Sequence, residues 1–232
     1  DVPDARKYIW DRAFAYGSLF ATFAQGVVLG NFIEGFKVTG RAFSGSSWDW
    51  FAPFPLLTGV GLVVGYTLLG ATWLYMKTQG ELQEWARDKS YWALWGILAF
   101  IVMVSVWTPL AQERIAARWF SQPNIFYFSA VPILTAVIAW LLWDSLRKGR
   151  EVLPFLSAMA LFFLSFIGLI ISLWPYVAPP SITLWDAATA PMSQQFLIVG
   201  TMFLLPVILL YVFWSYWVFR GKVRADTGYH QL

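Results

Sequence analysis

Three carboxylates stand beside apolar segments, where a charged group could take part in proton transfer. Glu34 lies near the end of one apolar stretch, Glu81 lies just beyond the next, and Asp186 lies in the sequence LWDA at 184–187. An ionisable residue within or beside a membrane segment is costly and is by default a functional candidate. We therefore take Glu34, Glu81 and Asp186 as candidate proton-transfer or interface residues.

Each carboxylate also has a structural interpretation. Glu34 and Glu81 stand close to an interface, where a carboxylate can stay hydrated. Glu81 follows the end of a predicted helix, where the helix dipole disfavours an anion, and Lys77 four residues earlier is the nearest basic partner. Asp186 could cap the start of the last predicted helix. The sequence is therefore compatible with either a functional or a structural role for each of these three residues.

Residue types that bind redox metals are scarce in this chain. It contains no cysteine, which excludes disulfides, thiolate-bound metals and iron–sulfur clusters. The single histidine, His230, lies in a polar tail and is interpreted as a solvated residue. Haem iron takes histidine, cysteine, methionine or tyrosine, so the interior could offer only methionine or tyrosine. We expect this chain to bind no cofactor or metal of its own and to have no catalytic residue.

The composition is that of a membrane protein. Of 232 residues, 59% are apolar and only 12% are charged, which is about half the charged share of a soluble domain. Fifteen tryptophans fit a chain whose amphipathic rings lie at two membrane–water interfaces. The net charge of +3 comes from clustered loop residues, so membrane lipids are expected partners and nucleic acid is not.

Six uncharged stretches are each long enough for a helix to cross about 30 Å of hydrocarbon, which takes about 18 to 20 residues. They are 13–33, 50–76, 90–112, 119–143, 152–185 and 187–219. Prolines after Trp174 end the fifth helix early. The sequence therefore predicts an all-α, polytopic transmembrane helix bundle, a single domain over 1–232. Its six membrane-spanning helices are expected at about 13–36, 54–76, 90–111, 124–144, 153–174 and 195–219.

The basic residues divide unequally between the two sides of such a bundle. Twelve fall on one side: Arg6, Lys7, Arg12, Lys77, Arg87, Lys89, Arg147, Lys148, Arg150, Arg220, Lys222 and Arg224. Four fall on the other: Lys37, Arg41, Arg114 and Arg118. Short cytoplasmic loops carry the excess of lysine and arginine, so this division predicts that both ends of the chain are cytoplasmic.

Small residues predict close helix packing. Gly17, Ala21, Gly26 and Gly30 recur four or five residues apart in the first helix, and the second contains Gly61 and Gly65. Such spacing favours close approach of two backbones in a membrane, although membrane helices are rich in glycine in any case. Hydrogen bonds between helices explain the polar Gln25 and Asn31 of the first helix without catalysis.

Several segments resemble the second subunit of the cytochrome bd-type quinol oxidases, and especially its cyanide-insensitive branch. They follow the order of that family and cover nearly the whole chain. The most specific is GATWLYMKTQGEL at 70–82. The others are FAQG at 23–26, GNFIEG at 30–35, PFPLLTGV at 53–60, WPYVAPPS at 174–181, LWDA at 184–187, PVILLY at 206–211, YWVFRGKV at 216–223 and GYH at 228–230.

The resemblance implies a subunit without haem ligands in a complex of the bacterial cytoplasmic (inner) membrane. Its partner, subunit I, would carry the haems b and haem d and reduce oxygen to water with electrons from quinol. A small single-helix subunit is a further expected partner. The family has additional N-terminal helices before the point that matches Asp1, so the chain is expected to be its C-terminal portion. The acidic residues of those helices have no counterparts here.

Two other functions are compatible with the residues alone. A transporter or channel could place Glu34, Glu81 and the broken region at 175–181 along a substrate path. A protein that binds quinone or lipid between aromatic-rich helices is the second alternative.

Overall fold

The computed structural model describes residues 4–39, 42–46, 48–218 and 220–222, with side chains described from Lys7 onward. His230 and the GYH segment at 228–230 lie outside the described residues. The fold is all-α, as the sequence predicts, with six helices long and apolar enough to cross a membrane. They are α1 (Asp4–Glu34), α2 (Pro53–Lys77), α3 (Glu81–Ala111), the pair α5 (Asn124–Phe128) and α6 (Ala130–Arg147), α7 (Leu153–Leu173) and α8 (Pro191–Val218).

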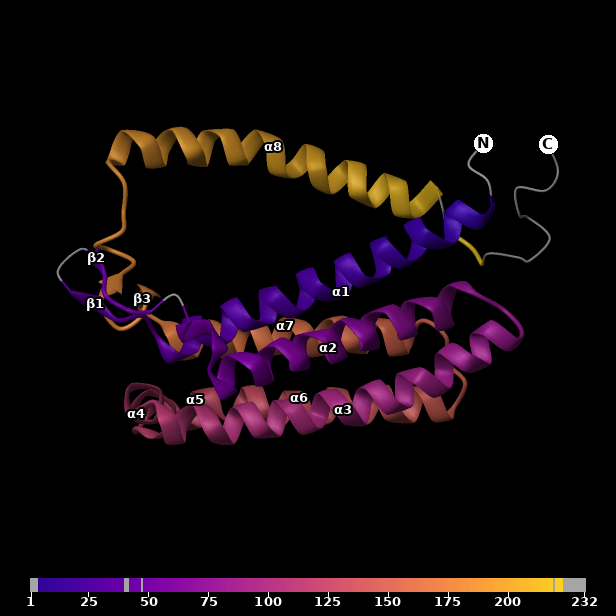
Figure 1. Ribbon diagram of the computed structural model, residues 1–232, viewed down its shortest axis with the longest axis horizontal. Coiled ribbons are helices and arrows are strands. Elements are labelled where there is room, and N and C mark those ends of the chain that lie inside the picture. The colour runs from indigo at the N-terminus through magenta and orange to yellow at the C-terminus, as the bar shows by residue number, and fades with distance from the viewer. Residues whose placement is uncertain (1–3, 40–41, 47, 219, 223–232) are drawn as a thin grey trace.

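Short elements gather at one end of the bundle, which we call the hairpin end (Figure 1). Two antiparallel two-stranded hairpins lie there, β1 with β2 and β3 with β4. Their strands are Val38–Thr39, Ala42–Phe43, Tyr176–Ala178 and Ile182–Thr183, and the 3-10 helix η1 (Asp49–Phe51) and the helix α4 (Glu113–Phe120) lie at the same end. The opposite end, where α2 turns into α3 and α6 into α7, carries most of the basic residues and is called the basic end.

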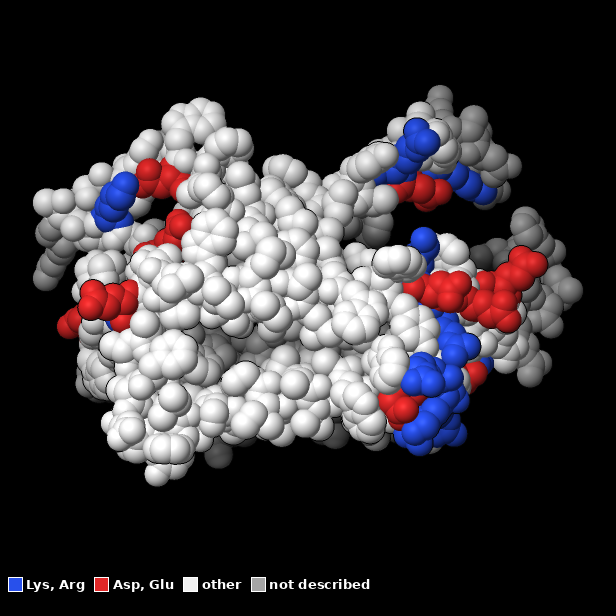
Figure 2. Space-filling model, turned by 90° about the horizontal axis from the view of Figure 1, so that it is seen from below, with Lys and Arg blue, Asp and Glu red and all other residues white. Residues whose placement is uncertain are grey.

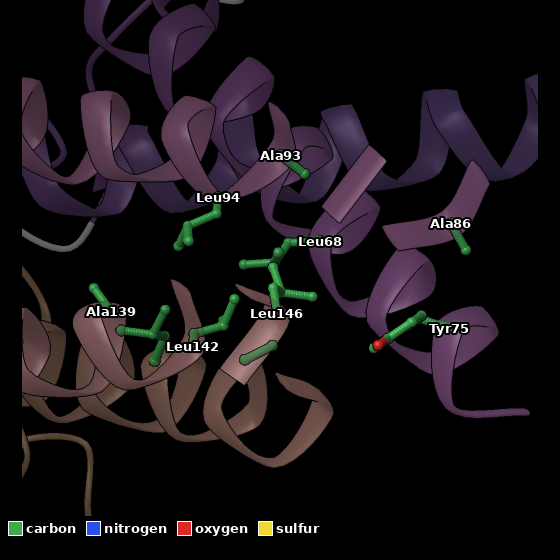
Figure 3. Close-up of a cluster of buried hydrophobic side chains, with 10 residues drawn as sticks. Leu68, Tyr75, Ala86, Ala93, Leu94, Ala139, Leu142 and Leu146 are labelled. Carbon is green, nitrogen blue, oxygen red and sulfur yellow. The ribbon is translucent and has the colours of Figure 1, made fainter. Parts of the chain in front are cut away.

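Helices α2, α3, α6 and α7 form the core of the bundle, and α1 packs along α2. The buried side chains of the cluster between these four helices are aliphatic or small, apart from Tyr75 (Figure 3). Leu68 and Leu142 are completely buried. The rest of this core consists of Ala86, Ala93, Leu94, Ala139, Leu146, Ala158 and Leu161.

The two ends of the bundle carry the charge. Figure 2 shows lysine, arginine, aspartate and glutamate side chains at both ends of one face, with a broad uncharged zone between them. A belt of this kind matches the hydrocarbon layer of a bilayer. The arrangement follows from the uncharged stretches of the sequence, since each crosses this zone once.

Several helices extend beyond the boundaries that the sequence predicts. The first begins at Asp4 rather than near 13, the third at Glu81 rather than 90, and the last at Pro191 rather than 195. The prediction was wrong at the first two ends because a charged residue marks where hydrocarbon ends, whereas a helix can continue into water. The start of the last helix was set by the apolar run near Gln195, but the helix begins at Pro191, since proline is tolerated in a first helical turn. In α3, Glu81 and Glu84 occupy the first turn, where the helix dipole favours acidic side chains.

The crossing of α1 and α2 depends on small residues. A methyl group on Gly30 would lie 2.5 Å from the Cα atom of Pro55, and one on Gly26 would lie 2.7 Å from the Cα atom of Gly59. The Thr58 hydroxyl, which is buried at this crossing, lies 2.8 Å from the Gly26 carbonyl oxygen. The predicted close approach is therefore confirmed for Gly26 and Gly30.

The other predicted glycines do not bring two backbones together. A methyl group on Gly17 would meet nothing within 4 Å. Gly61 and Gly65 instead accommodate the rings of Phe100 and Phe162. At these two positions the small residue makes room for an aromatic side chain of a neighbouring helix, Phe100 of α3 or Phe162 of α7.

Helix α8 stands apart from the other helices over most of its length (Figure 1). None of its residues is buried. An apolar helix with every face open must be covered by lipid or by another protein.

Candidate functional site

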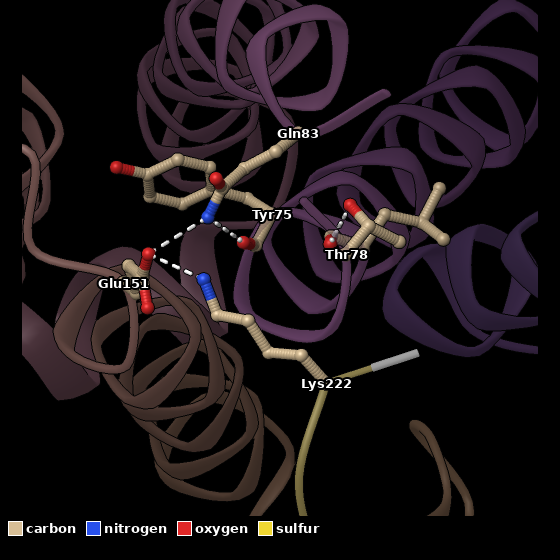
Figure 4. A network of polar contacts seen from close by, with 6 residues as sticks. Tyr75, Thr78, Gln83, Glu151 and Lys222 are labelled. Atoms are coloured by element: carbon tan, nitrogen blue, oxygen red, sulfur yellow. Dashed lines mark hydrogen bonds and ion pairs between the residues drawn. The ribbon is translucent and has the colours of Figure 1, made fainter. Parts of the chain in front are cut away.

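A polar network at the basic end joins three separate parts of the chain (Figure 4). Gln83, in the first turn of α3, donates one hydrogen bond to the carbonyl oxygen of Tyr75 at 3.1 Å and one to Glu151 Oε1 at 2.9 Å. Lys222, beyond α8, donates to the same Glu151 oxygen. Glu151 lies between α6 and α7, so its carboxylate connects the start of α3, the α6–α7 turn and the end of α8.

The hydrogen bonds from Lys222 and Gln83 hold the pKa of Glu151 below its usual value. Two further contacts bring α8 to the same place. Lys77 Nζ donates to the carbonyl oxygen of Gly221 at 3.2 Å, and the Trp73 and Tyr216 rings meet edge to face at 5.8 Å. We call the contacts of Glu151, Lys222, Lys77, Trp73 and Tyr216 the α8 latch.

We expect removal of the Glu151 carboxylate to release the end of α8. An exposed ion pair contributes about 0.2–1 kcal/mol, so Glu151→Ala should raise the population of released α8 by up to about fivefold. Because the chain has no cysteine, spin labels can be placed at Asp88 on α3 and Val218 on α8. The distance between the labels should become longer and broader, whereas Glu84→Ala should leave it unchanged.

The latch should also depend on pH. The pKa of Glu151 is lowered in the folded chain, so the stabilisation is present above its unfolded pKa and is lost as the pH falls through the lowered value. Concentrated salt should weaken the Lys222 pair in the same way. Identical label distances at neutral and strongly acidic pH would contradict this role for Glu151.

Arg87 fixes the neighbouring helix end. Its Nε and Nη2 atoms donate to the carbonyl oxygen of Leu146, and Nη2 also donates to that of Arg147 at 3.1 Å. These carbonyls belong to the last turn of α6, where the regular helical bonds have ended and the Leu146 carbonyl accepts only weaker backbone bonds, such as that from the Gly149 N–H at 3.3 Å. A guanidinium at a helix C-terminus satisfies them and suits the helix dipole.

The structure corrects the interpretation of Glu81. This residue is exposed and is the first of α3, whereas the sequence-based prediction placed it just beyond the C-terminus of α2, which ends at Lys77. Gly80, with a φ of +67°, lies immediately before α3. The carboxylate therefore lies at a helix N-terminus, where the dipole favours it, and the sequence-based view that it is poorly placed was wrong.

Glu34 lies at the opposite end of the bundle. It is the last residue of α1 and is partly buried. Beside it, Arg114 Nη2 donates to the carbonyl oxygen of Ile33 at 2.8 Å, and the Phe36 N–H donates to that of Pro179 at 2.7 Å. Burial lowers the pKa of the Arg114 guanidinium. The end of α1 is thus enclosed by α4 and by the loop that follows α7.

Asp186 shapes a turn. Its Oδ2 accepts hydrogen bonds from the backbone N–H and the hydroxyl of Thr183, at 3.1 and 2.6 Å. These bonds lower the pKa of the Asp186 carboxyl. The prediction that Asp186 caps the last helix is wrong. Helix α8 begins only at Pro191, and the Asp186 carboxylate accepts its hydrogen bonds from Thr183 in the same loop.

Asn31 also differs from expectation. Its Nδ2 donates to the carbonyl oxygen of Val27 at 2.9 Å within α1, and not to another helix. Gln25 is exposed. A side-chain amide in a helix can reach the preceding turn of its own backbone, which removes the need for a partner across the interface.

The three candidate carboxylates therefore do not form one site. Glu34 and Asp186 lie at the hairpin end and Glu81 at the basic end, separated by the 25 residues of α2, or about 37 Å at about 1.5 Å per residue. Sequence reasoning missed Gln83, Glu151 and Lys222. The division of basic residues could have placed Glu151 and Lys222 on one side, but not in contact.

The described residues include no group of three or more histidine, cysteine, aspartate or glutamate side chains that could hold a metal ion. Met103 lines an apolar groove of about 570 Å³, but every lining side chain belongs to α3. A bound cofactor needs apolar walls on more than one side, so this groove could not enclose a haem without a partner.

Six apolar spans with their charges at the two ends define a multi-pass helical membrane protein. The family model for cytochrome bd terminal oxidase subunit II matches residues 1–219. The chain belongs to this family.

Curated relatives carry the same description. The chain is 27% identical to cytochrome bd-I ubiquinol oxidase subunit 2 of Escherichia coli (strain K12), with 95% of this chain and 67% of that protein covered. It is 26% identical to the probable cytochrome oxidase subunit 2 of Haemophilus influenzae, with 100% of this chain and 71% of that protein covered. For cytochrome bd ubiquinol oxidase subunit 2 of Bacillus subtilis the identity is 23%, with 93% of this chain and 64% of that protein covered.

Proposed function

We propose that this chain serves as subunit II of a bd-type terminal quinol oxidase in a bacterial inner membrane. Quinol oxidation and the reduction of oxygen to water would take place on haems b and haem d of subunit I. This chain would support the partner and bind membrane lipid, without ligating haem, and a small single-helix subunit could complete the assembly. The family match over residues 1–219 carries the proposal.

The geometry of the chain gives little support to a transporter. That function needed Glu34, Glu81 and the region 175–181 along one path. Glu34 and Glu81 lie at opposite ends of the bundle, and residues 176–183 form a hairpin at one end rather than an unwound helix at mid-membrane depth.

The assignment is tested by purifying the full-length protein from its native membrane through an affinity tag. We expect a separate, larger subunit to accompany it and the reduced-minus-oxidised spectrum to show haems b and d. A haem-free preparation that transports solute into liposomes would instead support the transporter.

The proposal includes an orientation with the basic end in the cytoplasm, which rests on the division of twelve basic residues from four. A reporter that is active only outside the cytoplasm should be inactive when fused after Leu232. The same reporter should be active when inserted near Ser181, in the β3–β4 hairpin. The opposite pair of results would reverse the orientation.

Within this orientation we propose Glu81 as a group that takes up cytoplasmic protons. It is exposed at the basic end, where water can reach it. Glu81→Gln preserves the shape of the side chain and removes its charge, so oxygen uptake per haem should fall severalfold while haem per complex is unchanged. Glu84→Gln, in the same helical turn, is the matched control.

A structural role for Glu81 predicts a different outcome. The carboxylate would then stabilise only the α3 N-terminus, by about 0.3–1 kcal/mol. Glu81→Gln would lower the amount of assembled complex, and oxygen uptake per haem would remain at the wild-type level. That result would exclude proton uptake through Glu81. Glu34 and Asp186, at the other end, are proposed as interface residues.

A further inference from the structure

The segment 112–128 lies at the hairpin end, and its last five residues, Asn124–Phe128, begin the next membrane span. It contains α4 and α5 and follows α3 directly. Ile115 is 1% exposed and packs with Ile33 and Phe54, and Trp119 Nε1 donates to the Ser172 hydroxyl at 2.9 Å. One face of α4 is therefore fixed to the bundle. Because the spans on both sides begin or end here, the segment lies where hydrocarbon gives way to headgroups.

Arg118 on α4 has an unmet hydrogen-bonding group. Its Nε atom is buried and has no hydrogen-bond partner among the described residues. The ion pairs between described residues use Lys37, Lys148 and Lys222, and none uses Arg118. A guanidinium stays charged and acts only as a donor, so a partly dehydrated one requires an acceptor.

Arg114, one turn earlier, shows that this need is specific to Arg118. Arg114 donates to the Ile33 carbonyl oxygen and lies over the Tyr176 ring, 5.9 Å from its centroid. Its guanidinium thus has partners within the chain. The Arg118 main chain is also held, since Asn124 Nδ2 donates to its carbonyl oxygen at 3.3 Å. The backbone of Arg118 is therefore held in place, whereas the N–H groups of its guanidinium have no acceptor among the described residues.

The same segment exposes three large aromatic rings. Phe120, Phe126 and Tyr127 are 63%, 72% and 71% exposed. Exposed rings in one segment with basic side chains are typical of a segment that lies in the membrane interface, with its rings among the upper acyl chains. The segment 112–128 contains Glu113 as its one acidic residue against two arginines, which favours an anionic ligand.

We propose that residues 112–128 form a phospholipid-binding site in which the Arg118 guanidinium binds the headgroup phosphate and the exposed rings contact the acyl chains. A guanidinium can bind two phosphate oxygens at once through paired hydrogen bonds. The rings favour lipid over a carboxylate of a partner protein, because a lipid supplies acyl chains for the exposed apolar surface as well as a phosphate for the guanidinium nitrogens other than the buried Nε.

The site can be tested on the full complex in a maltoside detergent, which contains no phosphate. The probe is phosphatidylglycerol with a photoreactive diazirine next to the headgroup, and labelled peptides are mapped by mass spectrometry. Loss of one charge-assisted contact should lower labelling of 112–128 in Arg118→Gln by about tenfold. Lys37→Gln is the control, because Lys37 lies at the same end and pairs with Asp49.

Two further results decide the matter. Arg118→Lys should restore part of the labelling, which shows that lost labelling does not reflect misfolding. Equal labelling of wild type and Arg118→Gln would overturn the proposal. So would a loss of partner subunit in Arg118→Gln with lipid labelling per chain unchanged, because Arg118 would then bind protein.

Discussion

Gly30→Val should remove most of the chain from the assembled complex. The Gly30 Cα faces Pro55 and the Thr58 hydroxyl so closely that any side chain must separate α1 from α2. Overpacking costs typically about 1–3 kcal/mol, and this position lies at the upper end because the obstacle is backbone. The measurement is the amount of complex recovered after detergent extraction, together with its thermal unfolding temperature.

Gly17→Val is the matched control on the same helix, because a methyl group on Gly17 meets nothing within 4 Å. Its recovery and unfolding temperature should equal those of the wild type. If both variants assemble equally well, α1 and α2 do not require contact at Gly30.

Arg87→Met should destabilise the basic end by about 1.5–3 kcal/mol, which is the range for hydrogen bonds to charged groups. The change removes three donated bonds and leaves the Leu146 carbonyl of the last α6 turn with only weak backbone bonds, such as that from the Gly149 N–H at 3.3 Å. Thermal unfolding of the purified protein measures the loss. Arg87→Lys should recover only part of it, since one ammonium cannot reproduce the planar guanidinium.

Arg150→Met is the control for Arg87, because Arg150 is exposed at the same end of the bundle. It should shift the unfolding temperature little. An equal shift in the two variants would indicate a general effect of charge at this end rather than a helix cap made by Arg87.

The sequence predicted the six helices because the membrane imposes one rule on all of them: an uncharged length that spans the hydrocarbon. Their ends were predicted less well. Glu81 was placed outside any helix, just beyond α2, because charge was read as the limit of a helix, whereas it follows the turn at Gly80 and is the start of α3. A charge marks depth in the membrane, and Gly80 marks where the chain reverses.

The polar contacts could not be predicted for a different reason. Gln83, Glu151 and Lys222 are separated by 68 and 71 residues, and they meet only because α3, the α6–α7 turn and the end of α8 reach the same height. Local sequence patterns show neither how far each segment lies along the membrane normal nor how each helix is rotated about its own axis. The same limit applies to Gly26 and Gly30, whose spacing predicted a close contact but not that Pro55 and Gly59 would provide it.

The isolation of α8 has a consequence for how the protein enters the membrane during synthesis. None of its residues is buried, and it is the most apolar of the six spans, whereas the first span is the least apolar. A helix of this kind can partition from the translocon into lipid without help from helices already inserted. Insertion of α8 should therefore tolerate core substitutions that disrupt the packing of α1 on α2, and the ribosome can release the segment into the bilayer before the bundle has assembled.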